Sequence, residues 1–395
     1  MDFKLSPQEM AFLHGVREFL DQEALHPDAH DFMDADRDAH SQLANSPERR
    51  AFSKRMAKRG YLGMSWPQQF GGQGSPGMYE YLLNEELALR GAPLIGKGVG
   101  CIGKTIIRHG SESMKQFFLP LILDAEVEFA LGYSETGSGS DLASLRLRAE
   151  RDGEAWVLNG QKVWTTSANF AEWYWVAART NPNVPKHKGI SVFLLPMNTP
   201  GLTVRKIDTL GHHRTNEVFF DNVRIGPEAL VGELDKGWTY VCEALDFERF
   251  TFYTVNPLLQ KFERALQALR GRQRHGQPLS EDPGVRRAVG KLAAEIETAK
   301  MLQRRVVDAA AKGRVPAIEA AMYKVFSTRL QQVVTDFVLD HLGPVGLLRK
   351  GTIGAVDGGV WEHFYQTTPL DTIGGGTSEV QKNIIARRYL GLPLP

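Results

Sequence analysis

Apolar residues in the first third of the chain follow the spacing of a helix face. The segment Ser6-Pro7-Gln8-Glu9 combines an N-cap serine, a proline in the first helical turn and a capping-box glutamate. The apolar positions that follow are Phe12, Leu13, Val16, Phe19 and Leu20. Comparable patterns cover about 46–60, 78–90, 98–109 and 113–123. Residues 1–125 are therefore predicted to form a helical domain.

The next hundred residues change to short runs of β-branched and aromatic residues separated by Gly, Pro and Asn. The clearest runs are 173–177, 189–195 and 217–220. Such short strands between turn residues are typical of a compact sheet. Residues 126–235 are predicted to form a β-barrel-like domain.

Two dipeptides in this region have the composition of hairpin turns, Asp152-Gly153 and Asn159-Gly160. The second leads into Val163–Ser167, whose alternation predicts a strand. A strand there would place Trp164 and Thr166 on the same face.

After Gly237 the helical pattern returns. The predicted helices cover about 238–270, 283–312, 316–342 and 377–390, with a glycine loop at 374–376 before the last of them. Residues 236–395 are therefore predicted to form a four-helix bundle, which makes the whole fold α+β. Pro257 is expected to kink the first of these helices.

Composition and charge exclude several classes of protein. Lys and Arg number 47 against 46 Asp and Glu, so the net charge of +1 gives no general attraction for nucleic acid. No apolar run reaches the ~20 residues of a membrane span, and the N-terminus has no basic, apolar leader. The two cysteines, Cys101 and Cys242, are too few for a disulfide framework or a zinc cluster. We expect no metal site, and a bacterial cytoplasm or an organelle matrix as the compartment.

The segment Leu131–Leu142 has the composition of a ligand-binding loop. Three glycines and four Ser or Thr hydroxyls offer backbone N–H groups and short donors at close spacing. With Trp164 able to cover a ring, the loop suits a planar ligand that carries phosphates. An ordinary β-meander has the same features, so spacing alone leaves both interpretations open.

The loop and the later Asn159-Gly160-Gln161-Lys162-Val163-Trp164-Thr165-Thr166 together resemble the flavin-binding signature of the acyl-CoA dehydrogenase family. Thr136 stands where that family commonly has proline. Further matches are Trp66-Pro67 with Gly71-Gly72, Phe219-Phe220-Asp221-Asn222-Val223-Arg224, and Gly375-Gly376-Thr377-Ser378-Glu379-Val380-Gln381. The resemblance covers nearly the whole chain, and it implies the same three-domain order.

This resemblance implies a flavoprotein oxidoreductase of lipid catabolism that uses FAD to convert an acyl-CoA into its trans-2-enoyl-CoA. It also implies electron-transfer flavoprotein as the acceptor, and a homotetramer in which FAD sites are completed across subunits. The implied cofactor-binding residues are Tyr133, Ser134, Gly139, Ser140, Trp164, Thr166, Arg272, His275, Asp340, Gly343, Thr377 and Glu379. The implied substrate-binding residues are Ser140, Asp246, Arg249, Gly375 and Gly376.

Dehydrogenation of a thioester needs a carboxylate that removes the α proton. Most of the family carries this base directly before the final Gly-Thr, where this chain has Gly375. Glu248 lies in an apolar stripe of the first bundle helix, where burial raises the pKa of a carboxyl. From the pattern alone, a buried ion pair with Arg249 or a distant lysine is the more usual explanation of such a glutamate. Leu245–Arg249 resembles the Leu-x-x-Glu-Arg motif of the isovaleryl-CoA and long-chain branch, which implies Glu248 as the base. The backbone N–H of Gly375 remains a candidate donor to the thioester carbonyl.

Two other functions stay open. Asp340 and Pro344 replace a family glutamine and glycine, which is compatible with a subunit of a heteromeric dehydrogenase, for example of the steroid side-chain type. His275 stands where the family usually has phenylalanine. His212-His213 before Thr215-Asn216 is faintly similar to bacterial steroid side-chain enzymes. An oxygen-using oxidase or monooxygenase is the second alternative. The length, branching or steroid attachment of the acyl group is not predicted.

Overall fold

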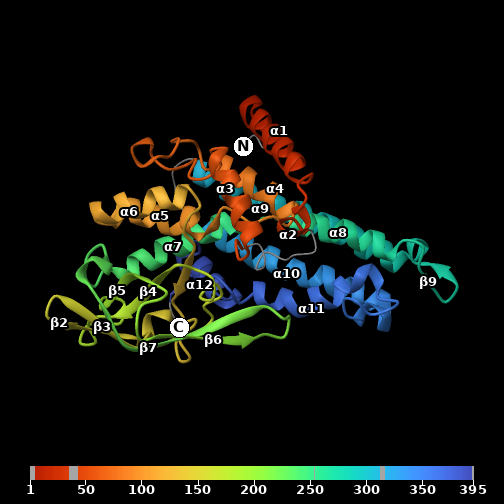
Figure 1. The fold of residues 1–395 in the computed structure, drawn as a ribbon. Helices are drawn as coiled ribbons and strands as arrows, with labels where there is room; N and C mark the ends of the chain where they lie inside the picture. The colour runs from red at the N-terminus through yellow and green to blue at the C-terminus, as the bar shows by residue number, and fades with distance from the viewer. Residues whose placement is uncertain (1–4, 35–42, 253, 312–315, 394–395) are drawn as a thin grey trace.

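The computed structural model describes residues 5–34, 43–252, 254–311 and 316–393, without the side chains of 248–252, 310 and 311. Helices at both ends of the chain flank a middle region of strands, and the C-terminal helices extend far from the sheet (Figure 1). The predicted α+β fold with helical, β and helical regions in that order is confirmed. Among the described helices, none is both long and apolar enough to cross a membrane.

The N-terminal region is helical, as predicted. Its α-helices are α1 (Pro7–Glu23), α2 (Ala29–Phe32), α3 (Pro47–Lys58), α4 (Met78–Leu89), α5 (Gly103–His109) and α6 (Glu112–Leu123). The capping box of α1 is present: Ser6 Oγ accepts the Glu9 N–H at 3.2 Å, and the Glu9 carboxylate accepts the Ser6 N–H at 2.7 Å. The predicted helix over 98–109 begins with a π-helical turn, Gly98–Ile102, before α5.

The middle region forms one open sheet rather than a closed barrel. Its strands are β1 (Phe129–Gly132), β2 (Arg148–Asp152), β3 (Ala155–Lys162), β4 (Trp173–Arg179), β5 (Ile190–Pro196), β6 (Leu202–Asp208), β7 (Arg214–Ile225) and β8 (Leu230–Val231). They are paired in the order β6-β7-β3-β2-β4-β5-β8, and β1 also pairs with β4. The barrel-like prediction needs this correction because β6 and β8, at the two ends of the order, are not paired with each other.

Two strands share one edge of β4. β1 pairs with residues 173–176 of β4 in parallel, and β2 reaches β4 only at the pair Arg148↔Arg179. The chain between these two strands, residues 133–147, therefore leaves the sheet at the seam between them. This is the glycine-rich loop that the sequence singles out.

Two local predictions in the sheet are wrong. Asn159-Gly160 is not a hairpin turn but lies inside β3, where the register against β7 shifts between Leu158 and Gly160. Val163–Ser167 is a loop rather than a strand, because β3 ends at Lys162. The hairpin at Asp152-Gly153 is confirmed, since Asp152 pairs with Ala155 across the β2–β3 turn.

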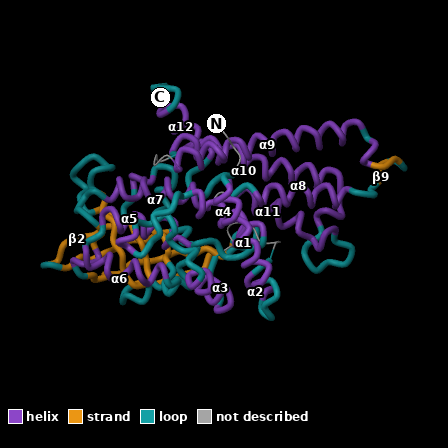
Figure 2. The backbone as a smooth tube through the Cα atoms, turned by 90° about the horizontal axis from the view of Figure 1, so that it is seen from above, coloured by secondary structure: helices purple, strands orange, loops and turns teal. Residues whose placement is uncertain are grey.

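The C-terminal region contains α7 (Gly237–Phe252), α8 (Asn256–Leu269), the short hairpin β9 (Gln273–Arg274) and β10 (Gln277–Pro278), α9 (Pro283–Ala311), α10 (Ala317–Leu342), α11 (Val360–Asp371) and α12 (Ser378–Arg388). Helices α8 to α11 run side by side away from the sheet, and β9 lies at their far end (Figure 2). The predicted helix over 238–270 is two helices, with Pro257 in the first turn of α8, where a missing N–H costs little. Helix α11 was not predicted.

Three hydrophobic cores hold these parts together. One core joins the N-terminal helices to α7 and to one face of the sheet. Side chains of β4 alternate between this core, which contains Trp175 and Ala177, and the core on the opposite face, which contains Tyr174 and Val176. The third core lies inside the C-terminal bundle. The sheet is thus fixed from the N-terminal side, and α7 leads from it into the bundle.

Glu128, which precedes β1, is a carboxyl placed where it is hard to ionise. Burial raises its pKa to about 7, although Lys97 and Arg50 act in the opposite direction. The folded protein holds this proton more tightly than the unfolded chain, whose carboxyl has a pKa near 4.5. The stability that Glu128 contributes is therefore present at low pH and is lost as the pH rises to about 7.

We predict that Glu128→Gln removes this pH dependence. As the pH rises from about 5 to about 8, the wild type should lose at most about 3 kcal/mol of stability that the variant keeps. The reason is that the amide of the variant stays neutral throughout. Melting temperatures of both proteins at the two pH values measure the effect. The control is Glu126→Gln, whose carboxylate is exposed and paired with Lys54 at 2.6 Å. A Glu128→Gln melt that follows the wild type at both pH values would contradict the assignment.

Candidate active site

The glycine-rich loop is held by an ion pair buried beneath it. Lys162, the last residue of β3, is fully buried and donates Nζ to the Tyr133 carbonyl at 3.0 Å and to Glu135 Oε1 at 2.7 Å. The Glu135 carboxylate also accepts the N–H groups of Arg146 at 2.6 Å and Leu147 at 2.9 Å. One carboxylate thereby joins both ends of the loop. Burial lowers the pKa of Lys162 to about 8, against the opposing effect of Glu135.

The outer part of the loop leaves its backbone open. A reciprocal pair of backbone hydrogen bonds between Glu135 and Ser138, at 2.9 and 3.0 Å, makes a tight turn. Gly137 and Gly139 have no neighbouring atom within 4 Å of the place where a Cβ would lie. Ser140 is exposed. This bare backbone allows a close approach by a phosphate-bearing ligand.

Thr136, which departs from the family's usual proline, has a role in this structure. Its Oγ1 accepts a short hydrogen bond from the Gln161 side chain of β3. A proline at this position would offer no acceptor on its side chain. The loop is therefore joined to β3 by Gln161 as well as by Lys162.

Trp164 projects from the chain directly after β3. Its indole side chain is large and apolar, yet the residue is 60% exposed, and its backbone has φ 63°, a left-handed conformation rare for a bulky residue. The buried Asn216 of β7 fixes this turn, donating Nδ2 to the carbonyls of Thr165 at 2.8 Å and Thr166 at 3.3 Å. Trp164 is thus not a core residue of the sheet. A left-handed backbone at a bulky residue is a kind of strain that is common at functional sites.

The same turn is connected to the N-terminal region. Lys97 Nζ, just before the π-helical turn, donates to Ser167 Oγ at 2.6 Å. Thr165 Oγ1 lies 3.1 Å from the Tyr174 hydroxyl in the sheet. Thr166, a predicted cofactor contact, is half-buried between them. The turn that carries Trp164 is therefore fixed from three directions.

A second glycine loop lies between α11 and α12. Gly375 and Gly376 both have left-handed backbones, with φ of 66° and 92°. Thr377 is the N-cap of α12, and its Oγ1 accepts the Val380 N–H at 3.2 Å. The backbone N–H of Glu379 itself, followed by the Thr377 hydroxyl, holds the pKa of the Glu379 carboxyl below its ordinary value. The predicted start of the last helix near 377 is confirmed.

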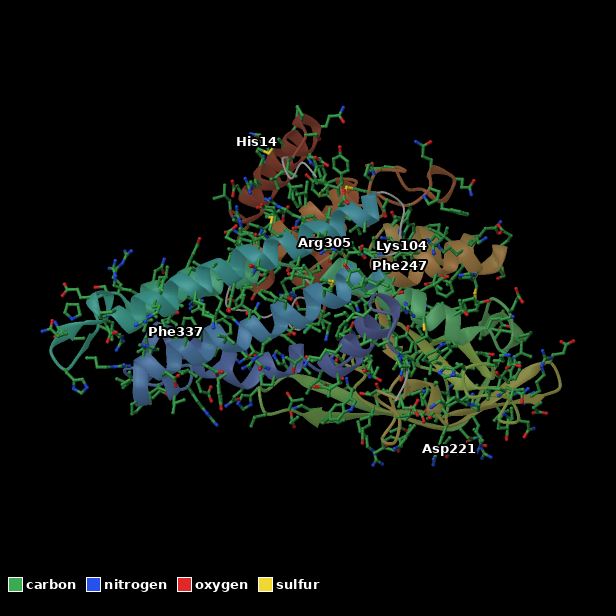
Figure 3. The ribbon with its side chains drawn as sticks, turned by 180° about the vertical axis from the view of Figure 1, so that it is seen from behind. His14, Lys104, Asp221, Phe247, Arg305 and Phe337 are labelled. Carbon is green, nitrogen blue, oxygen red and sulfur yellow. The ribbon has the colours of Figure 1, made fainter. Side chains whose placement is uncertain are left out.

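Helix α7, which contains the predicted base, is anchored by α5. The Phe247 ring lies under the Lys104 ammonium at 5.6 Å and the Arg108 guanidinium at 4.9 Å; Lys104 and Phe247 are neighbours in Figure 3. Glu243 accepts from His109 Nε2 at 2.9 Å. Asp246 is half-buried. The side chains of Glu248 and Arg249 lie outside the described residues, so their roles stay predictions.

Four of the predicted cofactor residues lie elsewhere in this chain. Arg272, His275, Asp340 and Gly343 are at the far end of the bundle around the β9 hairpin, away from the sheet and its loop (Figures 1 and 2). There Arg274 donates to the Asp340 carbonyl at 3.5 Å, and Arg272 donates Nε to the Ala268 carbonyl at 3.1 Å. One chain therefore does not bring these residues to the glycine-rich loop.

Sequence reasoning missed the residues that support the loops: Glu135, Lys162 and Asn216. A signal for Lys162 was present in β3, because the alternation from Trp156 and Leu158, both buried, places Lys162 on the same inward face. A lysine on such a face predicts a buried ion pair. No local pattern marks Asn216, whose acceptors lie some fifty positions away in the sequence.

Family models match the chain from end to end. The acyl-CoA dehydrogenase N-terminal, middle and C-terminal domains match residues 6–126, 130–223 and 235–390 respectively. The chain belongs to the acyl-CoA dehydrogenase family. It is accordingly an oxidoreductase of a flavoprotein family.

Individual relatives agree with this family. Acyl-CoA dehydrogenase FadE26 of Mycobacterium tuberculosis is 33% identical over 346 residues, or 86% of each chain. The solved structure named Tcur3481-Tcur3483 steroid ACAD superposes with a TM-score of 0.88 at 30% identity, covering 100% of both chains. The ChsE4-ChsE5 complex from Mycobacterium tuberculosis gives 0.87, also at 30% identity and 100% coverage of each.

The glycine-rich loop and the Trp164 turn of this acyl-CoA dehydrogenase fit a flavin nucleotide. An exposed indole on a rigid turn offers an aromatic face, and the open backbone at Gly137 and Gly139 offers N–H groups for phosphates. Asn216 holds the turn that carries the indole, and the Lys162–Glu135 pair holds the glycine-rich loop. The residues present are therefore compatible with the family's cofactor.

We predict that Lys162→Met loosens the glycine-rich loop. Without the ammonium, the Glu135 carboxylate, whose side chain is only 9% exposed, loses its charged partner. Such a change costs about 3–5 kcal/mol for buried pairs. The melting temperature should fall, and flavin absorbance per chain after purification should fall with it.

The matched control is Lys186→Met. Lys186 pairs with Asp141 of the same loop at 2.7 Å, but both side chains are about half exposed, so its removal should change neither measurement. Equal flavin content in the two variants would contradict the proposed importance of the buried pair.

Proposed function

We propose that this protein uses FAD to convert an acyl-CoA thioester into its trans-2-enoyl-CoA. The observation that carries the proposal is the exposed indole of Trp164, held at a strained backbone by Asn216 beside an open glycine-rich loop. Bound FAD would supply the acceptor for the hydrogen that leaves the β carbon as hydride. The residues proposed to hold it are Tyr133, Ser134, Gly139, Ser140, Trp164, Thr166, Thr377 and Glu379.

Glu248 is the proposed general base for the α proton. It lies four and seven positions after Ala244 and Val241 on α7, and both of these residues are buried. A carboxylate on this stripe of the helix is supported by the Leu245–Arg249 resemblance to the helix-borne base. Gly375, which occupies the family's more usual position, has no side chain to compete for the role.

The thioester is proposed to lie between α7 and the second glycine loop. Ser140, Asp246 and Arg249 would follow the CoA and acyl portions, while the N–H groups of Gly375 and Gly376 face the carbonyl oxygen. Each of these groups binds or orients the substrate. The proton moves to the Glu248 carboxylate.

The assembly is proposed to contain more than one chain. Arg272, His275, Asp340 and Gly343 lie at the end of the bundle, so a second subunit has to bring such residues to the FAD of the first. A homotetramer with electron-transfer flavoprotein as acceptor is the proposed arrangement. A heterotetramer is the second candidate, because two similar solved structures carry paired names, Tcur3481-Tcur3483 and the ChsE4-ChsE5 complex.

The substrate class is tested by titration without oxygen. The protein produced alone is mixed with acyl-CoAs of increasing length, with branched acyl-CoAs and with a steroid-linked thioester, and loss of the oxidised flavin band is followed. Bleaching by one class supports the function and identifies the class. A colourless protein that becomes yellow and active only with a second chain supports the heteromer, and rapid reoxidation by air with peroxide formation supports an oxidase instead.

We predict that Glu248→Gln slows flavin reduction by about 10²–10⁴-fold, since an amide cannot accept the α proton. Stopped-flow absorbance at saturating substrate measures the rate. Glu243→Gln is the control, because Glu243 lies on the same helix but faces His109. A Glu248→Gln protein that is reduced as fast as Glu243→Gln would show that the base is another residue.

A further inference from the structure

A group of charged side chains lies next to the turn that carries Trp164. Lys97 is half-buried, and its Nζ donates to Ser167 Oγ at 2.6 Å. Ser167 is itself buried and directly follows Thr166, a proposed flavin contact. The Lys97 ammonium is therefore one hydrogen bond and one residue away from the proposed cofactor site.

Two carboxyls and a second cation complete this group. The carboxyl oxygens of Glu128 lie 3.7 and 3.9 Å from the place where a Cβ on Gly96 would be, so Glu128 approaches the backbone directly before Lys97. Glu172 accepts the Glu128 N–H at 2.8 Å and pairs with Arg50 at 2.6 Å. The charged groups that act on Glu128 are Lys97, Arg50 and Glu172.

The net charge of this group changes when Glu128 titrates. While Glu128 is protonated, the cations Lys97 and Arg50 face one carboxylate, so the group carries one positive charge. Once Glu128 is ionised, the charges cancel. Because burial raises the pKa of Glu128 to about 7, this change falls near neutral pH.

We propose that Lys97 is a charge-compensating residue that stabilises the reduced flavin, an inference that rests on the proposed function. Hydride transfer would add two electrons and one proton to a bound flavin, which leaves a negative charge on the ring. An ammonium held by the Trp164 turn lowers the energy of that charge, since a protein interior screens charges less than water does. Ionised Glu128 opposes the effect of Lys97.

The competing explanation is that Lys97 only fastens the Trp164 turn to the N-terminal region. Ser167→Ala distinguishes the two, because it removes the acceptor and keeps the ammonium, whereas Lys97→Met removes the ammonium as well. A loss of fastening alone affects both variants equally. The control for removal of a cation from the same region is Lys54→Met, since Lys54 pairs with Glu126 at 2.6 Å and both are about half exposed.

The test is the midpoint potential of the FAD-loaded protein, measured without oxygen against a redox dye. In Lys97→Met, the equilibrium constant for flavin reduction should fall about 10-fold, which is about 30 mV for a two-electron couple. Ser167→Ala and Lys54→Met should leave the potential nearly unchanged. A Lys97→Met potential equal to that of Ser167→Ala would overturn the inference.

Glu128→Gln tests the same inference in the opposite direction and keeps the test decisive if Lys97→Met folds poorly. At about pH 5, where Glu128 is protonated, variant and wild type should have equal potentials. At about pH 8 the variant should have the higher potential, because its group keeps the positive charge. Equal potentials at both pH values would also overturn the inference.

Failure of the proposed function gives a different result. If the potentials shift as predicted but no acyl-CoA bleaches the flavin, the proposed reaction is wrong and the effect of Lys97 on the flavin stands. If acyl-CoA reduces the flavin and the potentials do not shift, only this inference is wrong. A protein that takes up no FAD in any assembly would overturn both.

Discussion

The buried ammonium of Lys162 is the constraint on which the rest of the site depends. A charge without access to water requires close partners, and the chain provides the Tyr133 carbonyl and the Glu135 carboxylate. Satisfying that charge fixes the glycine-rich loop where it leaves the seam between β1 and β2. Lys162 also ends β3, so Trp164, two residues later, starts from a fixed point. One buried pair thus positions the glycine-rich loop and the start of the turn that Asn216 holds.

A second buried carboxylate caps the helix that follows the one carrying the proposed base. Glu85 of α4 accepts the N–H groups of Val255 and Asn256, each at 2.8 Å, at the start of α8. Its complete burial raises its pKa, while these donors and Gln303 act in the opposite direction. The N-terminal region therefore caps the bundle helix that follows α7. The start of α8 thus depends on a residue of another region, and Pro257 lies in its first turn.

The buried groups Lys162 and Glu85 show which features of this fold the sequence can predict and which it cannot. The Ser6–Glu9 cap was predictable because both partners lie within one turn, and the order of helical and β regions follows from hydrophobic period. Pro257 indicated an irregular helix, but a full break depends on Glu85, about 170 positions away. Asn159-Gly160 has the composition of a hairpin turn, yet it lies within β3, where the pairing with β7 shifts register. Local chemistry predicted the glycine loops, whereas the residues that hold them come from distant strands and helices.

We propose that these loops hold an acyl-CoA while hydrogen is removed from its α and β carbons. The most direct test is the rate of flavin reduction, without oxygen, by a substrate that carries deuterium at C2 and by one that carries it at C3. The account predicts slower reduction for either label, with trans-2-enoyl-CoA formed in proportion to the flavin reduced. Reduction at an unchanged rate with both labels, or without enoyl product, would contradict it.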